Sequence, residues 1–205
     1  MIVTDPEKIE ERSMQIIESE LTADIPEENK AVVKRVIHCT ADFDYAENLA
    51  FSEGAVKAAL AAIGRGCRIV TDTNMAKAGI NKAAAAKLGI EVCCFMSDPD
   101  VAGAARERGC TRAVVSMEKA AALEGETVFA IGNAPTALLR LRELIDEGAV
   151  RPALVIGVPV GFVNILESKE AIMAANVPYI VAKGRKGGSN VAAAIVNALM
   201  YQITR

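Results

Sequence analysis

Short apolar runs that alternate with helical segments constrain the fold of this chain more than any other feature. The runs lie at 67–71, 90–95, 127–131, 153–157 and 178–182, and a segment with helical signals follows each of them. Strands of this length that alternate with helices are typical of βαβ units, and a parallel sheet covered on both faces requires nearly continuous apolar strands. The sequence therefore predicts an α/β fold, a three-layer sandwich with a mostly parallel central sheet.

Helical signals also precede the sheet. An Asp-Pro pair begins a segment over 5–21, as an N-cap residue and a first-turn proline do. Apolar pairs at the helical interval indicate a second helix over 26–39, and a third, over 52–66, ends in a glycine turn. Because no linker or low-complexity segment divides the chain, we expect N-terminal helices followed by the sheet in a single domain over residues 1–205.

Composition and charge narrow the class of protein. Apolar residues make up 52% of the chain and aromatic residues only 4%, so aliphatic side chains must build the core. The formal net charge of −3 argues against nucleic-acid binding. No apolar run reaches the roughly 20 residues that span a bilayer, and residues 1–11 lack the hydrophobic region of a signal peptide. We therefore expect a cytoplasmic protein without nucleic-acid or membrane partners.

The cysteines of the chain fit reduced thiols. Their odd number and irregular spacing do not suit a disulfide framework, and a single histidine argues against a tetrahedral zinc site. We expect small buried apolar side chains at Cys39, Cys67, Cys93, Cys94 and Cys110.

The segments that leave the carboxyl ends of the apolar runs have an unusual composition. Ligands bind at this edge of open parallel sheets, and four segments bring glycine, proline and polar residues to it: 72–79, 132–136, 157–162 and 183–189. Any one of them can be an ordinary turn. Four on one edge favour a site that offers backbone N–H groups at helix N-termini, which attract carboxylates or phosphates.

The last of these segments also carries Lys183, Arg185 and Lys186 in a chain that is acidic overall. Such a run is often a solvated turn, but the Gly-Gly-Ser that follows lets backbone and cations converge on one anion. Neither the P-loop order nor the dinucleotide fingerprint is present, and no nucleophile elbow indicates a serine hydrolase. A nucleotide-dependent enzyme is therefore disfavoured.

His38 is the only histidine in the chain. Histidine is the usual group for moving a proton near neutral pH, so His38 is the first candidate for a proton donor. A packed core histidine beside Val36 and Ile37 is the alternative. Asp42 and Asp44 follow closely, and either can orient the imidazole or cap a loop.

Seven stretches carry a further signal when they are taken in order. They are Glu11-Arg-Ser13, Val36-Ile-His38, Asp72-x-x-Met75 with Gly79, Ile131-Gly-Asn-Ala-Pro-Thr-Ala-Leu138, Gly157-Val-Pro-Val-Gly-Phe-Val163, Glu167-Ser-Lys169 and Gly184-Arg-x-Gly-Gly-Ser189. Together they span nearly the whole chain and resemble the precorrin-8X methylmutase (cobalt-precorrin-8 methylmutase) family.

The resemblance implies a cofactor-free isomerase of cobalamin biosynthesis, with cobalt present only as part of the substrate. Such an enzyme moves a methyl group from C-11 to C-12 of the tetrapyrrole precorrin-8X or cobalt-precorrin-8, which gives hydrogenobyrinate or cobyrinate. The family's catalytic histidine falls on His38, which would be the proton donor and acceptor. Family members are homodimers with sites near the subunit interface, so we expect a homodimer.

The resemblance and the composition of the loops together predict the residues that bind the substrate. Cations and helix N-termini suit a tetrapyrrole that carries many carboxylates. The expected residues are Ser13, Asp42, Asp72, Met75, Arg112, Gly132, Asn133, Pro135, Thr136, Pro159, Gly161, Gly184, Arg185, Lys186, Gly188 and Ser189.

One departure from the family pattern follows the histidine. Many relatives have Thr-Gly-Asp where this chain has Thr40-Ala41-Asp42. A positive φ at Ala41 would be strained, because only glycine adopts it at no steric cost.

The alternative function is that of a carrier protein, which would bind a corrinoid without catalysing a reaction. The sequence leaves open whether the natural substrate contains cobalt.

Overall fold

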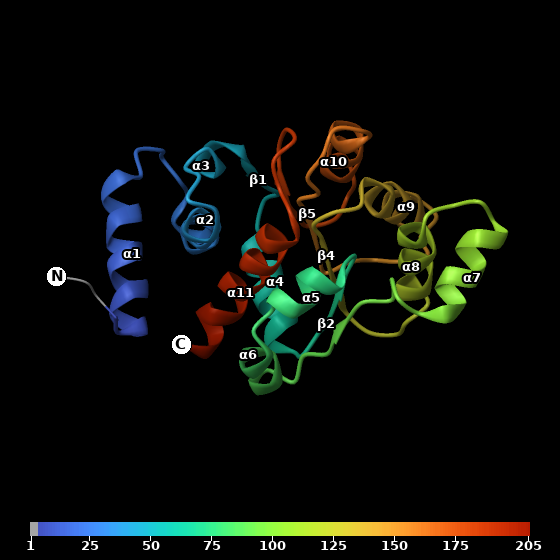
Figure 1. Cartoon of the computed structure of the whole chain (residues 1–205), viewed down its shortest axis with the longest axis horizontal. Coiled ribbons are helices and arrows are strands. Elements are labelled where there is room, and N and C mark those ends of the chain that lie inside the picture. Colours follow the sequence, from blue (N-terminus) through green and yellow to red (C-terminus); the bar gives the residue numbers. More distant parts are fainter. Residues whose placement is uncertain (1–3) are drawn as a thin grey trace.

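A single sheet organises the molecule. The structure is a computed structural model that describes residues 4–205, and its six strands lie in the order β1-β6-β5-β4-β2-β3. All neighbouring strands are parallel except β1, which pairs with β6 in the antiparallel sense. Helices cover both faces of the sheet (Figure 1). The predicted three-layer α/β sandwich is confirmed, including the helices that precede the sheet.

The strands are short, and helices make up most of the chain. The strands are β1 (Leu49–Phe51), β2 (Arg68–Thr71), β3 (Val92–Cys93), β4 (Thr127–Ile131), β5 (Leu154–Gly157) and β6 (Tyr179–Ala182). The helices are α1 (Pro6–Glu20), α2 (Glu27–Thr40), α3 (Tyr45–Asn48), α4 (Ala55–Gly64), α5 (Asn74–Gly79), α6 (Lys82–Lys87), α7 (Pro99–Glu107), α8 (Arg112–Ala121), α9 (Pro135–Asp146), α10 (Ile165–Met173) and α11 (Ser189–Thr204).

The alternation of side chains along each strand divides the core into two layers. In β4, Val128 and Ala130 pack with α2, α4 and α11, whereas Phe129 and Ile131 pack with α8 and α9. The other parallel strands alternate in the same way, because successive side chains of a strand point to opposite faces. Both faces of the central strands are therefore buried, which explains their nearly continuous apolar sequence.

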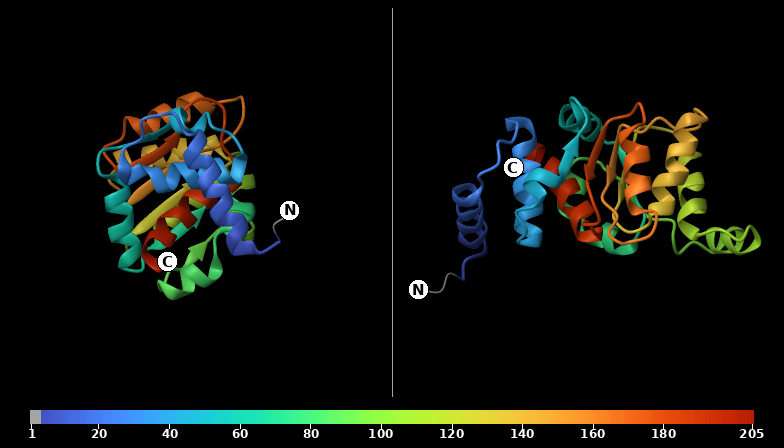
Figure 2. Two further views of the ribbon diagram at one scale, coloured as in Figure 1. Left: turned by 90° about the vertical axis from the view of Figure 1, so that its left-hand side faces the viewer. Right: turned by 90° about the horizontal axis from the view of Figure 1, so that it is seen from above.

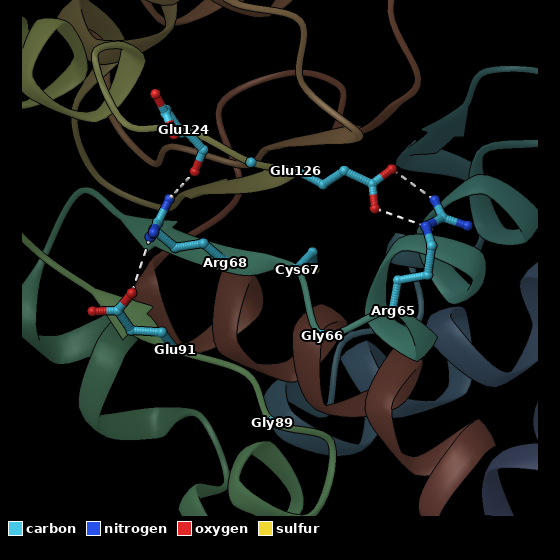
Figure 3. Close-up of a pocket in the computed structure, with 9 residues that line it drawn as sticks. Arg65, Gly66, Cys67, Arg68, Gly89, Glu91, Glu124 and Glu126 are labelled. Carbon is cyan, nitrogen blue, oxygen red and sulfur yellow. Dashed lines mark hydrogen bonds and ion pairs between the residues drawn. The ribbon is translucent and has the colours of Figure 1, made fainter.

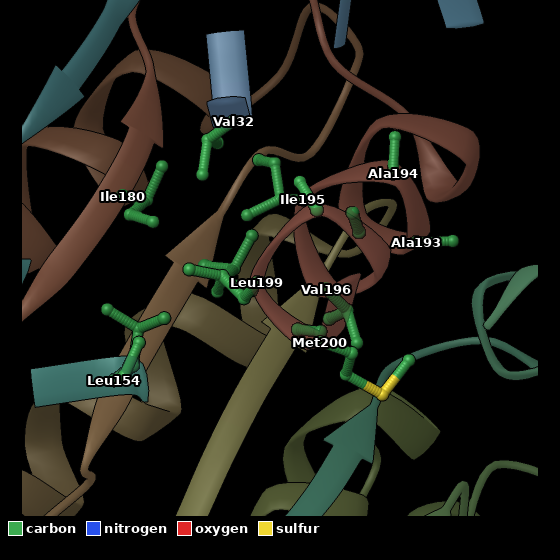
Figure 4. Packing of buried hydrophobic residues seen from close by; sticks show 14 of the residues in the cluster. Val32, Leu154, Ile180, Ala193, Ala194, Ile195, Val196, Leu199 and Met200 are labelled. Atoms are coloured by element: carbon green, nitrogen blue, oxygen red, sulfur yellow. The ribbon is translucent and has the colours of Figure 1, made fainter. Parts of the chain in front are cut away.

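Helix α11 is the centre of the first layer. Its side chains Ile195 and Leu199 are fully buried and lie against Leu154 of β5 and Ile180 of β6 (Figure 4). The small residues Ala193 and Ala194 lie on the side of the helix away from these strands (Figure 4). A helix that is apolar on nearly all sides is typical of the interior of a layered fold, and α11 packs against α2, α4 and α5 as well as the sheet.

Four short elements differ from the sequence prediction. Helices α3 and α5 and strand β1 were not expected, and the strand predicted over 90–95 is reduced to β3. The helix predicted from Ser52 begins at Ala55. Ser52 instead accepts the Tyr179 N–H through its Oγ, 3.0 Å away, and thereby secures the end of β1. The edge strands are held by hydrogen bonds to a single neighbour, which no local periodicity predicts.

Helix α1 stands outside the three layers. It packs on α2 and lies at one end of the molecule, far from α7 at the other (Figure 2). Glu10 accepts hydrogen bonds from Arg35 of α2 (2.6 Å) and from Arg205 at the end of the chain (2.8 Å). Within residues 4–205, no helix is long and apolar enough to cross a membrane.

The cysteines are free, as predicted, but only Cys67 is buried; Cys39 is exposed and the other three are partly buried. The expectation of mainly buried apolar cysteines is therefore confirmed for Cys67 and wrong for Cys39. In the described part of the chain, no three His, Cys, Asp or Glu side chains are grouped so as to hold a metal ion.

Candidate active site

Four connections meet at the carboxyl ends of the parallel strands, and we call this region the carboxyl edge. They are the β2–α5, β4–α9, β5–α10 and β6–α11 connections, and they hold most of the predicted substrate residues. In open parallel sheets, ligands bind at this edge. The structure thus brings the four Gly/Pro-rich segments together, as the sequence predicts.

Asp72 ties two of these connections together. Its side chain is 0% exposed, and its carboxylate accepts the backbone N–H groups of Gly132 (2.9 Å), Asn133 (2.8 Å) and Ala134 (2.7 Å). Burial raises the pKa of the Asp72 carboxyl, and the three donors oppose that rise. With its oxygens occupied in this way, Asp72 holds the loop that begins at Gly132.

The N-terminus of α11 joins this network. The hydroxyls of Thr73 and Ser189 lie 2.8 Å apart, which links the β2–α5 connection to the first residue of α11. Gly132 approaches the same point so closely that a Cβ there would lie 2.7 Å from the Gly188 carbonyl oxygen. The backbone contact leaves no room for a side chain, so glycine is required at position 132.

The β5–α10 and β6–α11 connections run side by side. Gly188 donates its N–H to the Val158 carbonyl (2.8 Å), and Gly161 donates to the Arg185 carbonyl (3.2 Å). Gly187 has a φ of 157°, and a Cβ there would overlap the Val158 carbonyl oxygen at 2.1 Å. These contacts set the conformation of the loop that carries Arg185 and Lys186.

His38 lies on the last turn of α2 and is exposed. The alternative that it is a packed core residue is therefore wrong; the neighbouring Val36 and Ile37 are the buried residues. The next residue, Cys39, has its Sγ 3.9 Å from the Asn190 carbonyl oxygen at the start of α11. The end of α2 is thus placed beside the carboxyl edge, and His38 on this last turn is exposed.

Ala41 ends helix α2 in the left-handed region, with φ 53° and ψ 30°. Its N–H donates to the Ile37 carbonyl at 2.7 Å, as C-terminal capping residues do. The strained positive φ that the sequence raised as a possibility is confirmed, at a position where glycine is the usual residue.

Asp42 and Asp44 bind a cation of the β6–α11 connection. Lys186 Nζ lies 2.6 Å from Asp42 Oδ2 and 2.6 Å from Asp44 Oδ2. The hydrogen bond from Lys186 lowers the pKa of Asp42, and the two carboxylates raise the pKa of Lys186. Both carboxylates therefore hold Lys186, and among the described residues neither forms a hydrogen bond or ion pair with His38.

Ser13 and Arg112 belong to helices that lie toward opposite ends of the molecule's long axis. Ser13 is on α1, where its hydroxyl donates to the Ile9 carbonyl (2.8 Å), and Arg112 is the first residue of α8 (Figure 1). Beside Arg112, Thr111 shares a hydrogen bond with Thr136 of α9 (2.9 Å). Arg112 thus borders the carboxyl edge, whereas Ser13 shares no contact with that edge among the residues described.

The remaining predicted residues differ in exposure. Pro159, Gly188 and Ser189 are buried and shape the edge, as Asp72 and Gly132 do. The first turns of α5 and α9 hold Met75, which is 73% exposed, and Pro135. The surface of the edge is therefore formed by Met75, Asn133, Gly184, Arg185 and Lys186, which are all exposed.

Sequence reasoning missed two features of the β5–α10 region. Phe162 and Val163 are 83% and 73% exposed, and the Arg185 guanidinium lies 5.5 Å from the centre of the Phe162 ring. Because aromatic residues make up only 4% of the chain, the presence of Phe162 in this connection was a signal that sequence reasoning could have used. Lys169 was quoted only as part of a motif, yet it is 1% exposed and donates to two carbonyls of the β6–α11 connection.

A cavity of about 410 Å³ lies at the opposite edge of the sheet, around the starts of β2 and β4 (Figure 3). Its charged side chains already pair with one another: Arg65 with Glu126 at 2.7 Å and Arg68 with Glu91 at 3.0 Å. Both of these arginines are paired with carboxylates, whereas Arg185 at the carboxyl edge forms no ion pair among the described residues, so the cavity is the weaker candidate for an anionic ligand.

The fold and the site together define a class: a three-layer α/β protein whose carboxyl edge presents cations, helix N-termini, exposed apolar side chains and one accessible histidine. The sequence profile of one family, precorrin-8X methylmutase, matches residues 8–202. The chain therefore belongs to the precorrin-8X methylmutase family, as the ordered motifs indicated, and it is an enzyme of the isomerase (intramolecular transferase) class.

Proteins of this family with assigned names match the chain over nearly its full length. The cobalt-precorrin-8 methylmutase of Salmonella typhimurium (strain LT2) is 45% identical, and the match covers 98% of this chain and 97% of that protein. The precorrin-8X methylmutase of Pseudomonas aeruginosa is 41% identical and covered to 96% on both sides. The crystal structure of precorrin-8X methyl mutase from Thermus thermophilus superposes with a TM-score of 0.87 at 44% identity, covering 96% of this chain and 97% of that one.

Proposed function

We propose that this enzyme catalyses the methyl shift from C-11 to C-12 of precorrin-8X or cobalt-precorrin-8 in cobalamin biosynthesis. The observation that carries the proposal is the exposed His38 beside a carboxyl edge built from the motifs of the family. Relatives matched over nearly their whole length carry the names of both forms of the reaction. The products would be hydrogenobyrinate or, when cobalt is already inserted, cobyrinate.

His38 supplies the proton chemistry in this proposal. Protonation of the macrocycle by the imidazole makes the carbon that receives the methyl group more electrophilic, and the methyl migrates with its bonding electrons. Return of the proton to His38 leaves an isomer of the substrate and the original enzyme. The reaction needs no cofactor, and cobalt takes part only as a component of the substrate.

The carboxyl edge suits a substrate with many carboxylates. Arg185 and Lys186 lie on the exposed surface of the β6–α11 connection, and α11 directs its N-terminal backbone N–H groups toward the same edge. The exposed apolar residues Met75, Phe162 and Val163 offer contacts for the flat apolar faces of the macrocycle. The remaining predicted residues would orient the acetate and propionate arms.

A homodimer in the cytoplasm completes the proposal. Ser13 and Arg112 are separated along the molecule (Figure 1), so a site that uses both needs the second copy to supply one of them. Helix α1 packs on α2 alone among its larger contacts, and it leaves Ile9 and Ile16 44% and 42% exposed. An apolar surface of this kind is suited to a subunit interface.

Turnover with defined substrates tests the function. Purified protein is mixed with excess metal-free or cobalt-containing substrate, and the absorbance is followed. An enzyme converts the excess, and the preferred form identifies the natural substrate.

We expect His38→Ala to lower the turnover rate by at least about 100-fold, the usual scale for general acid catalysis, while product binding survives. Wild-type turnover in His38→Ala would remove His38 from the mechanism, and a spectral change limited to one equivalent would identify a carrier.

A further inference from the structure

Lys169 is a buried cation behind the β6–α11 connection. It lies on α10 with 1% of its surface exposed, and its Nζ donates to the carbonyl oxygens of Gly184 (2.7 Å) and Lys186 (2.9 Å). Among residues 4–205, no carboxylate forms an ion pair with it. Burial lowers the pKa of Lys169 to about 8. A buried ammonium without an anionic partner costs stability, so its position calls for a functional reason.

The carbonyls that Lys169 binds belong to the loop that carries the cations of the carboxyl edge. The carbonyl between them, that of Arg185, accepts the Gly161 N–H at 3.2 Å. Three consecutive carbonyl oxygens of this loop are thus occupied by groups of the protein. Carbonyl oxygens turned toward the edge would repel the carboxylates of a ligand, and the hydrogen bonds of Lys169 and Gly161 prevent this.

The side chains of the same loop connect it to the other parts of the site. Lys186 binds Asp42 and Asp44, in the segment that follows His38, and Arg185 lies over the exposed Phe162 ring. A change in the backbone at 184–186 would therefore displace both cations together. It would also release the contact between the loop and the end of α2.

We propose that Lys169 is a positioning residue for substrate binding: its ammonium holds the Gly184 and Lys186 carbonyls and so fixes Arg185 and Lys186 at the carboxyl edge. Its buried charge adds to the attraction of that edge for carboxylates. This inference rests on the proposed function, because the polyanion in question is the tetrapyrrole. Lys169 does not touch the reacting atoms, so it acts on binding and not on the methyl shift.

The test replaces Lys169 with Met, which keeps the apolar stem but removes the ammonium. We expect the dissociation constant for hydrogenobyrinate and the KM to rise at least about tenfold, while kcat changes much less. In amide hydrogen exchange, the Gly161 and Gly188 N–H groups should exchange faster, whereas the amides of β4 and β5 keep their protection. Lys57→Met, at an exposed lysine of α4, is the matched control and should change none of these quantities.

Two further variants of Lys169 test the same role. Lys169→Arg retains a charged donor and should recover part of the lost affinity. If Lys169→Met does not fold, Lys169→Gln, a neutral donor of similar length, takes its place with the same expected direction. Unchanged affinity, a fall in kcat without a rise in KM, or faster exchange over the whole sheet would overturn the role of Lys169. Failure of the wild type to bind or convert tetrapyrrole would overturn the proposed function instead.

Discussion

At the scale of single residues, hydrogen bonds within the protein distinguish the carboxylates near the site from His38. Asp72 and Asp42 were both predicted to contact substrate, yet the carboxylate of Asp72 is closed off by three backbone donors and that of Asp42 binds Lys186. His38 is exposed and makes neither kind of contact in the residues described. The candidate proton donor is thus separate from the charged groups that build the site around it.

Ala41 offers a direct test of backbone strain. Because its φ is 53°, Ala41→Gly should raise the free energy of unfolding by about 1 kcal/mol, the usual cost of a left-handed conformation for a residue with a Cβ. Urea unfolding measures the difference. Ala61→Gly, at an exposed position in the interior of α4, is the control and should lower stability by about 1 kcal/mol. A loss of stability in Ala41→Gly would contradict the left-handed cap.

At the scale of elements, the short connections do more to define the site than the helices and strands. The β2–α5, β4–α9 and β6–α11 connections are joined by the Asp72 carboxylate, the Thr73–Ser189 hydrogen bond and the close approach of Gly132 to Gly188. Parallel strands bring these connections to one edge. The hydrogen bonds then set their spacing, so a displacement of one connection moves the others.

Gly132→Ala should show this coupling. A Cβ at position 132 would lie 2.7 Å from the Gly188 carbonyl oxygen. The backbone at Gly188 cannot move away without displacing the start of α11. We expect a loss of stability of about 1–3 kcal/mol, typical of overpacking, and a larger loss of product affinity. Gly103→Ala in α7 is the matched control, since no atom beyond the neighbouring backbone of its own helix lies within 4 Å of the added Cβ, and it should be neutral or stabilising. Equal effects in the two variants would rule out the contact.

At the scale of the whole molecule, the proposed site, which uses both Ser13 and Arg112, is incomplete in one copy of the chain. Helix α1, which holds Ser13, and helix α8, which begins at Arg112, lie toward opposite ends of the molecule (Figures 1 and 2). The side chains of Ile9 and Ile16 on α1 are exposed. One connected cluster of buried residues, by contrast, joins the central helices to the sheet. We therefore expect a second copy of the chain to cover this side of α1.

Sedimentation equilibrium should therefore detect a dimer. Ile16→Glu places a charge on the apolar side of α1, so it should weaken dimerisation by at least about tenfold, because a buried charge without a partner is costly at an interface. Ala83→Glu adds the same charge on the exposed side of α6 and should leave the dimer intact. A wild-type monomer at micromolar concentration, or an unchanged dimer in Ile16→Glu, would contradict this arrangement.

The strands, the long helices and the sheet class followed from the sequence, because each depends on the local pattern of apolar residues and caps. The ordered motifs identified the family for the same reason: they are local. The tertiary structure alone decided that β1 pairs with β6, that Asp72 holds Gly132, and that Lys169 binds the Gly184 and Lys186 carbonyls. Those contacts join residues far apart in the chain, and their geometry exists only once the sheet has brought them to one edge.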